Sequence, residues 1–290
     1  MDPFASSNEL FYRHSWKAPI GGLLLVAATG LTSTLLLGLV YGYVMFFIPF
    51  IYIKIFIMIG YPIVIGFIVS WAVDRGKIRN SAIVVLAGVG FGILADYAGW
   101  VAWMAAALGS ADFLMAFFFP GEVLSFMRAV AEVGIYVISN TRPTGVILYL
   151  VWLVEAATVI GVTAWFVITN HFDSPFCEEC GNWVTAERYI GLFYPIPNQA
   201  NFQREIKQGN FSVIGDLKPR KEGSLFTKLT MRECQTCHNF QLLSVKSLSL
   251  SVNSKNQLES KNKTIISNLR VTPGLLSILQ RLITQQIQSE

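Results

Sequence analysis

Charged residues are scarce in this chain. Asp, Glu, Lys and Arg make up only 14% of its 290 residues, whereas 53% of them are hydrophobic. Soluble domains average about 25% charged residues, and the mean hydropathy of +0.51 is far above what such domains tolerate. The apolar excess is confined to residues 18–169. This distribution excludes a wholly soluble protein and predicts a membrane-embedded first half followed by a soluble second half.

Several catalytic signatures are missing as well. The chain contains no G-x-x-x-x-G-K-[ST] phosphate loop, no H-E-x-x-H and no G-x-S-x-G. Its histidines, His14, His171 and His238, do not cluster in sequence with a second candidate catalytic group. A non-enzymatic role is therefore favoured, and an enzyme acting on membrane lipid is the least favoured class.

Long basic runs and the pattern typical of a removable signal peptide are also lacking. The net charge of +4 belongs to the second half, where Arg220-Lys221 is too short to form a basic patch, so no nucleic-acid partner is expected. Arg13, His14 and Lys17 precede the first apolar run, and no small-residue cleavage site follows a short apolar core. We therefore expect no cleaved signal peptide.

Four apolar stretches are long enough to cross a bilayer, at about 1.5 Å per residue and about 30 Å of hydrocarbon. They cover approximately residues 20–47, 50–73, 81–108 and 145–169. Pro49 separates the first two, and Pro62 is expected to kink the second. The sequence thus predicts an α-helical polytopic membrane domain over residues 20–169, preceded by a segment over residues 1–19.

Residues 111–139 form an additional amphipathic or re-entrant segment. Glu122, Arg128 and Glu132 fall at helical spacing and share one polar face, while apolar side chains cover much of the rest. Such a helix can lie in the membrane interface, or it can span with its polar stripe against other helices or water. Charge asymmetry favours four crossings over five.

With four crossings, the N-terminus, the loop at residues 75–79 and the second half all lie on one side. That side carries most of the basic residues flanking the spans, which indicates the cytoplasm: Arg13, Lys17, Arg75, Lys77 and Arg79. We therefore expect a multi-pass protein of the inner or plasma membrane with both termini cytoplasmic. A fifth crossing would place the second half outside.

Small residues recur along the third apolar stretch. Gly88, Gly92 and Gly99, with the intervening alanines, keep to one face, and Gly38 and Gly42 offer the same spacing in the first stretch. Small side chains let helix backbones approach closely, and such packing drives helix association in lipid. Tight packing within one chain is the favoured interpretation, and contact between copies in a homo-oligomer is the alternative.

Ionisable residues also occur inside the predicted membrane spans. Asp96 and Glu155 fall midway along the third and fourth stretches, and Lys54 lies nearer the outer end of the second. A charge at such depth costs about 2.5–3.5 kcal/mol on insertion scales, so these groups are expected to face a partner or a wet cavity. Two interpretations stay open: a proton or cation path, or protonated carboxyls bonded to hydroxyls such as those of Tyr97 or Thr158.

All four cysteines fall into two pairs, Cys177-Glu-Glu-Cys180-Gly and Cys234-Gln-Thr-Cys237. A C-x-x-C turn places two thiolates on one knuckle, and two knuckles complete a tetrahedral four-sulfur site. Gly181 suits the tight turn of such a knuckle. The pattern resembles the zinc-ribbon or rubredoxin-like knuckle group, although the stretch between the pairs is long for a minimal ribbon. This resemblance implies a structural Zn²⁺ ion rather than catalysis.

Other uses of the cysteines are less favoured. Cys234, Cys237 and His238 match the C-x-x-C-H signature of c-type haem attachment, but that use leaves Cys177 and Cys180 unexplained. A disulfide or a redox dithiol pair prefers an oxidising compartment. Iron in the same four-sulfur site stays open.

The rest of the second half predicts a small α+β, zinc-ribbon-like domain over residues 170–252. FSVIGDL and SLFTKLTM indicate strands on either side of a KPRKEG turn, and residues 245–252 alternate like a strand. Residues 253–290 are expected to form a polar linker, over 253–263, and a helix opening at Pro273. The favoured role is a membrane adaptor whose cytoplasmic zinc domain docks a protein partner. The alternative is an ion- or proton-conducting component that uses Asp96 and Glu155.

Overall fold

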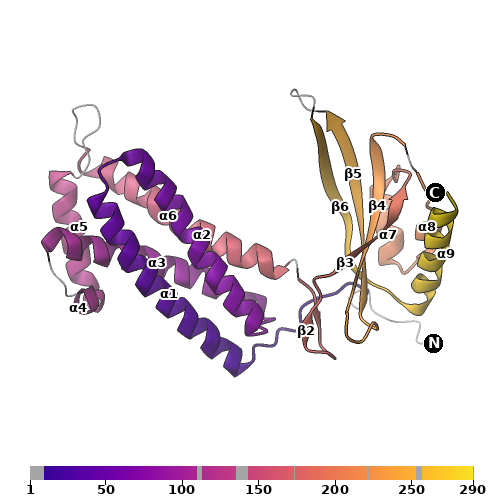
Figure 1. Ribbon diagram of the computed structural model, residues 1–290, viewed down its shortest axis with the longest axis horizontal. Coiled ribbons are helices and arrows are strands. Elements are labelled where there is room, and N and C mark those ends of the chain that lie inside the picture. Colours follow the sequence, from indigo (N-terminus) through magenta and orange to yellow (C-terminus); the bar gives the residue numbers. More distant parts are fainter. Residues whose placement is uncertain are drawn as a thin grey trace. The chain divides into compact units, whose positions relative to one another are not determined.

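The computed structural model describes residues 10–109, 113–134, 143–172, 174–220, 222–252 and 257–289. The chain divides into two units (Figure 1). The membrane unit comprises His14–Asp173, and the soluble unit combines Met1–Arg13 with Ser174–Glu290. The expected boundaries at residues 19–20 and 169–170 therefore lie a few residues away from the boundaries of these units.

The membrane unit contains the four long apolar helices that the sequence predicts: α1 (Ile20–Phe47), α2 (Ile51–Arg75), α3 (Ser81–Leu108) and α6 (Val146–Phe172). The shortest has 25 residues and therefore extends about 37 Å, enough to cross the hydrocarbon core. Large apolar side chains such as Leu24, Phe56 and Trp165 point outward, as lipid contact requires. This protein is therefore a multi-pass membrane protein.

Contacts at one end of the bundle show the direction in which each helix runs. Before α1 begins, the Lys17 carbonyl accepts a 2.8 Å hydrogen bond from the N–H of Arg79, between α2 and α3. The His14 ring stacks on that of His171 at the end of α6, with centroids 4.5 Å apart. The start of α1, the α2–α3 connection and the end of α6 thus share one end, so α1, α2, α3 and α6 alternate in direction.

The connection from α3 to α6 therefore begins and ends at the opposite end of the bundle. It contains α4 (Phe113–Phe117) and α5 (Pro120–Val133), and residues 135–142 lie outside the described part of the chain. With 14 residues, α5 is about 21 Å long, too short to span. Its Val123 and Ala131 are buried, whereas Glu122, Arg128 and Glu132 are exposed. The predicted amphipathic helix is present and lies at one end of the bundle.

The small residues of α3 contact two different helices. A Cβ atom added to Gly92 would lie 2.9 Å from the Cα of Ile160 in α6, and one added to Gly88 would lie 3.0 Å from the Cα of Ala164. Gly99 instead lies against α1, where Gly42 meets its carbonyl oxygen and Gly38 lies against Ala98. The glycines thus let α3 pack closely between α1 and α6 within one chain.

The soluble unit is an antiparallel sheet with helices on one face (Figure 1). The strands follow the order β3 (Glu187–Phe193), β4 (Leu225–Glu233), β5 (Gln241–Val252) and β6 (Leu258–Arg270). The helices are α7 (Gln199–Lys207), α8 (Ser212–Gly215) and α9 (Pro273–Ser289). Apolar side chains from both layers form one core: Phe193, Leu229, Leu243 and Val245 from the sheet, and Ile206, Ile214, Leu275 and Leu279 from the helices. The predicted α+β domain is confirmed.

Two local predictions in this unit differ from the structure. Residues 212–215, expected in a strand, form the short helix α8, which turns Ile214 into the core, and the Asn210 side chain accepts a hydrogen bond from the Ser212 N–H. Residues 258–263, expected in a linker, belong to β6 and pair with β5, for example Lys261 with Ser249. Backbone pairing explains this, because it does not depend on apolar side chains. Residues 253–256 lie outside the described part.

The segment before α1 adds to the sheet of the soluble unit. Phe11 forms a β-bridge with Leu269, and the Tyr12 N–H donates a 2.9 Å hydrogen bond to the carbonyl of Asn268. The Tyr12 hydroxyl accepts a hydrogen bond from the N–H of Phe176. The two ends of the membrane unit therefore lead into one folded unit, which requires an even number of crossings between them.

Candidate metal centre

Two tight turns bring the cysteine pairs together. Cys177 ends β1 (Phe176–Cys177), and Cys180 lies in the turn to β2 (Asn182–Trp183). Cys234 and Cys237 lie in the connection between β4 and β5. The four Sγ atoms all lie within 4.8 Å of one another. Residues that are about 60 positions apart along the chain thus form one cluster, as the paired spacing predicts.

The two knuckles have the same backbone geometry. The Gly181 N–H donates to the Cys177 carbonyl at 2.9 Å, and the His238 N–H donates to the Cys234 carbonyl at 3.0 Å. Both residues adopt positive φ, +63° at Gly181 and +55° at His238. Glycine adopts this conformation without steric cost, whereas histidine does not. The tight turn expected at Gly181 is therefore present, and its counterpart at His238 is held in a less favourable conformation.

The spacing of the sulfurs suits a tetrahedral metal ion. The Cys177 and Cys237 Sγ atoms lie 3.8 Å apart. For Zn–S bonds of about 2.3 Å, a regular tetrahedron places its sulfurs about 3.8 Å apart. The cluster is thus compatible with a zinc-ribbon-like site. Four protein ligands leave no open position for substrate or water, which is typical of a structural centre.

Apolar side chains surround the cluster. Cys177 and Cys234 are buried together with Val184, and Phe240 packs against them. The rings of Phe176 and Trp183 contact each other edge to face at 4.9 Å, and Phe240 meets the ring of Tyr12 at 5.7 Å. An apolar environment of this kind limits access of water to the ligands. Tyr12, from the segment before α1, thus helps to enclose the centre.

The thiols differ in acidity. Hydrogen bonds from the backbone N–H groups of Cys237 and Thr236 lower the pKa of the Cys234 thiol to about 6. Desolvation and the neighbouring thiols raise the pKa of Cys180 to about 12. A bound cation supplies the positive charge that keeps such ligands deprotonated. A bound cation would therefore favour a four-thiolate state at neutral pH.

The geometry also bears on the haem alternative. The His238 Nδ1 atom lies 2.7 Å from Oε1 of Glu233, and its side chain is 64% exposed. Haem attachment would use Cys234, Cys237 and His238 alone, whereas the structure places Cys177 and Cys180 against the same two sulfurs. A single four-sulfur centre accounts for both pairs.

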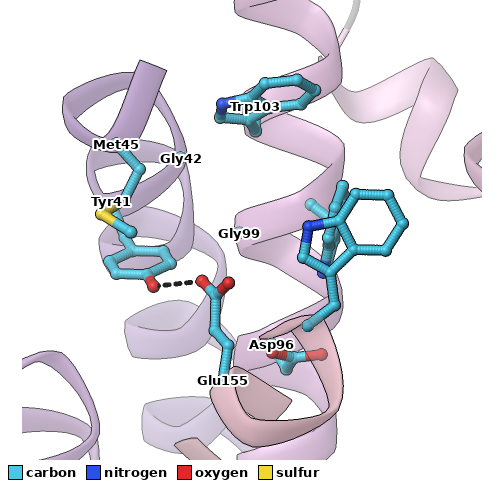
Figure 2. A pocket seen from close by; sticks show the side chains of 9 residues that line it. Tyr41, Gly42, Met45, Asp96, Gly99, Trp103 and Glu155 are labelled. Atoms are coloured by element: carbon cyan, nitrogen blue, oxygen red, sulfur yellow. Dashed lines mark hydrogen bonds between the residues drawn. The ribbon is translucent and has the colours of Figure 1, made fainter. Parts of the chain in front are cut away.

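A second group of predicted residues meets inside the membrane unit (Figure 2). The Tyr41 hydroxyl of α1 donates a 2.5 Å hydrogen bond to Oε1 of Glu155 in α6. Glu155 and Asp96 of α3 line one small cavity, together with Tyr41. Lys54 does not line this cavity, but it shares a larger, apolar one with Glu155. The structure thus brings the two intramembrane carboxyls together, and Lys54 lines a second cavity that Glu155 also lines.

The hydroxyls expected to bond these carboxyls have other partners. The Tyr97 hydroxyl donates to the carbonyl of Phe117, and the Thr158 hydroxyl donates to that of Val154. Tyr41 makes the bond to Glu155 instead, and sequence reasoning did not identify it. One signal was available, because Tyr41 shares the face of α1 that carries Gly38 and Gly42, and that face meets α3.

In comparisons with known proteins, no protein-family model, curated protein or solved structure matches this chain.

Proposed function

We propose that this chain is a non-enzymatic adaptor of the inner or plasma membrane, with a cytoplasmic docking domain held together by zinc. One observation carries the proposal: the four cysteine sulfurs form a complete, closed ligand set. A closed set stabilises a fold and does not bind substrate. The soluble unit is then a recognition surface attached to a membrane anchor.

Zinc is the ion that best fits this role. Four thiolates in tetrahedral arrangement suit zinc and iron, but zinc has no redox chemistry and is the usual structural ion of such knuckles. We expect the full-length protein, purified without added metal, to contain one zinc ion per chain. Iron in the same stoichiometry would replace zinc in this proposal, and the absence of any metal would refute it.

The sheet face opposite the helices offers a surface for docking. Strand pairing places Lys228 of β4 beside Lys246 of β5 and Leu192 of β3. The Nζ atom of Lys228 lies 6.0 Å from the centre of the Tyr189 ring, which is 52% exposed. Nearby, the Arg220 guanidinium lies 4.8 Å from the centre of the Tyr194 ring. No run in the sequence shows this basic and aromatic face, because pairing of distant strands assembles it.

Charge complementarity favours an acidic protein segment as the partner. The one carboxylate paired with these cations among the described residues of this face is Glu187, whose Oε1 lies 3.3 Å from Nζ of Lys246. The remaining positive charge favours an anionic partner, and exposed tyrosines are enriched in protein interfaces. The basic face, defined by Tyr189, Tyr194, Arg220, Lys228 and Lys246, is therefore the proposed docking site.

Photo-crosslinking in native membranes tests this assignment. A crosslinking amino acid at Tyr189 should capture an acidic protein, and the product should weaken at high salt. Lys228→Glu combined with Lys246→Glu should abolish it. The same crosslinker at Gln280, exposed on the helical side, is the matched control. Capture that survives both charge reversals, or that occurs equally from Gln280, would contradict docking at the basic face.

Placement in the cytoplasm is supported by charge. The end of the membrane unit that holds the start of α1 also carries the α2–α3 connection. Arg75, Lys77 and Arg79 lie in or beside that connection, and Arg13 and Lys17 precede α1. Basic residues flanking spans favour the cytoplasmic side.

A second candidate function is a proton or cation path through the membrane unit. It is favoured by the observation that Asp96 and Glu155, from different helices, line one cavity. Flux of protons and cations into liposomes would be compared for the parent protein, Asp96→Asn and Glu155→Gln. Flux that either substitution abolishes supports a path. No flux from a folded protein leaves the adaptor as the function.

A further inference from the structure

A polar cavity lies between α1, α3 and α6 (Figure 2). Its lining includes the carboxyls of Asp96 and Glu155 and the hydroxyl of Tyr41, and the indole rings of Trp100, Trp103 and Trp152 form much of its wall. Gly42 and Gly99 also line it, and their lack of side chains lets α1 and α3 approach closely there. Three helices of the membrane unit thus bring oxygen ligands together beside an aromatic wall.

The size of the cavity restricts what it can hold. Its volume is about 30 Å³, and a site needs roughly 10–15 Å³ by this measure to hold one water molecule. One small inorganic ion or about two water molecules fit, whereas an organic ammonium ion does not. Cavities that stay empty in proteins are apolar, so a cavity lined by two carboxyls is expected to be filled.

Hydrogen bonding singles out Asp96 as the group that lacks a partner. The carboxyl of Glu155 accepts a hydrogen bond from Tyr41. Within the part of the chain that the structure describes, no donor is found for the carboxyl of Asp96, although it faces the cavity (Figure 2). Asp96 is half-buried and lies near the middle of α3. An ionised carboxyl at that depth is costly in a membrane, so Asp96 requires either a proton or a cation.

The charges around the cavity set the charge of the occupant. The ionisable groups that face it or its walls are Tyr41 of α1, Tyr61 and Lys54 of α2, Asp96 of α3 and Glu155 of α6. Tyr61 stacks on Tyr41 at 4.3 Å and donates its hydroxyl hydrogen to the Ala95 carbonyl, so it is a neutral wall. Lys54 shares the adjacent cavity with Glu155 and offsets its charge. One negative charge, that of Asp96, is left, and a single positive charge neutralises it.

We propose that this cavity binds one small monovalent metal cation of the size of Na⁺, held by the carboxylates of Asp96 and Glu155 and by the Tyr41 hydroxyl, in competition with a proton on Asp96. The inference deepens the second candidate function, since it names the ion, but it concerns binding and does not require conduction. Oxygen ligands of this kind suit hard cations. The small volume favours a small inorganic ion over an organic cation, and the single uncompensated charge disfavours divalent ions.

Thermal unfolding of the full-length protein in detergent tests the proposal. Replacing choline chloride with NaCl at equal ionic strength should raise Tm by about 3 °C or more, because a ligand that binds only the folded state stabilises it. Asp96→Asn should abolish the difference between the two salts. Glu122→Gln, on the exposed face of α5, should leave it unchanged. Equal Tm values for the parent protein in both salts would overturn the proposal.

A second measurement needs no variant and so remains decisive if Asp96→Asn fails to fold. A hydrophobic carbodiimide modifies protonated carboxyls within membranes, and mass spectrometry locates the product. We expect modification at Asp96 in choline chloride and at least tenfold less in NaCl. Equal modification in both salts would show that only a proton binds, which overturns the inference.

The flux measurement tests the proton or cation path independently of the proposed binding site. Protection by Na⁺ without any flux would leave the binding site in place and remove the path. Proton flux without an effect of Na⁺ on Tm or modification would support the path and refute the cation site.

Discussion

At the scale of residues, the metal centre shows which features the sequence reveals directly. Two C-x-x-C pairs predict a four-sulfur cluster because the spacing alone sets the turn geometry. His238 is different, since nothing in the sequence indicates that it occupies the position corresponding to Gly181 with φ of +55°. Only the repetition of the knuckle, with the same hydrogen bond to the first cysteine of each pair, makes the equivalence visible.

This equivalence predicts opposite effects of substitution at the two positions. His238→Gly places a residue without a side chain in the left-handed conformation, which relieves strain, and it removes an exposed contact with Glu233. The free energy of unfolding should therefore stay within about 1 kcal/mol of the parent value or rise. Zinc should be retained. Gly181→Ala should lower the free energy of unfolding by about 1 kcal/mol, because its φ of +63° disfavours a side chain. Loss of the metal from His238→Gly would contradict the assignment of the ligands.

A pH dependence follows from Glu187. The Thr230 hydroxyl, with Lys246 and Arg232 nearby, lowers the pKa of its carboxyl below the usual value. A depressed pKa in the folded state adds stability above the unfolded pKa of about 4.3 and loses it as the pH falls through the folded value. Because the group is partly exposed, Glu187→Gln should cost only a few tenths of a kcal/mol at pH 7. Urea unfolding at pH 7 and pH 3 measures this, and a difference that persists at pH 3 would rule out ionisation as the cause.

At the scale of elements, hydrophobic patterning predicts the long helices well, since four of them are apolar over more than 20 residues. Short elements are harder. The helix α8 has four residues and depends on burial of Ile214, and β6 is largely polar and exists because β5 pairs with it. Tertiary contacts determine both, so local patterns could not reveal them. The bridge between Phe11 and Leu269 likewise joins the two ends of the chain and has no local signal.

Close packing of α3 predicts a difference between two of its glycines. Gly92 lies against the backbone of Ile160, with 2.9 Å available to an added Cβ, whereas nothing lies within 4 Å of Gly90. Gly92→Ala should therefore destabilise the membrane unit by about 1–3 kcal/mol through overpacking. Gly90→Ala should be neutral or stabilising, because alanine favours helix. Thermal unfolding in detergent compares them, and equal stability would mean that α3 and α6 do not approach this closely.

At the scale of the whole molecule, the chain returns to the side from which it enters the membrane. Residues 10–12 pair with β6, so the segment that precedes the membrane unit and the segment that follows it both belong to the soluble unit. The sequence could favour four crossings over five from the charges of its loops, but it could not show this pairing. The same holds for Asp96 and Glu155. The sequence shows that both lie near the middle of a membrane span, but it does not show that they line one cavity with Tyr41.

The topology predicts where the ends of the chain are accessible. Tags at the N-terminus and the C-terminus should both resist protease in intact cells and become accessible only after permeabilisation. A tag inserted after Gly134, in the connection between α5 and α6, should be cleaved in intact cells. Tags at the two ends that respond differently would contradict an even number of crossings. A reversed pattern for all three would retain the fold and place the soluble unit outside.

The metal content of the intact protein tests the central claim most directly. Native mass spectrometry of the full-length chain should show one zinc ion per chain. Cys237→Ser should lower the apparent zinc affinity by more than about 100-fold, since changes outside the ligand shell alone cost 10–100-fold. Thr236→Ala, in the same turn, should leave the affinity near the parent value. A metal-free chain that is nevertheless folded, or one with Cys177, Cys180, Cys234 and Cys237 joined as disulfides, would contradict the account.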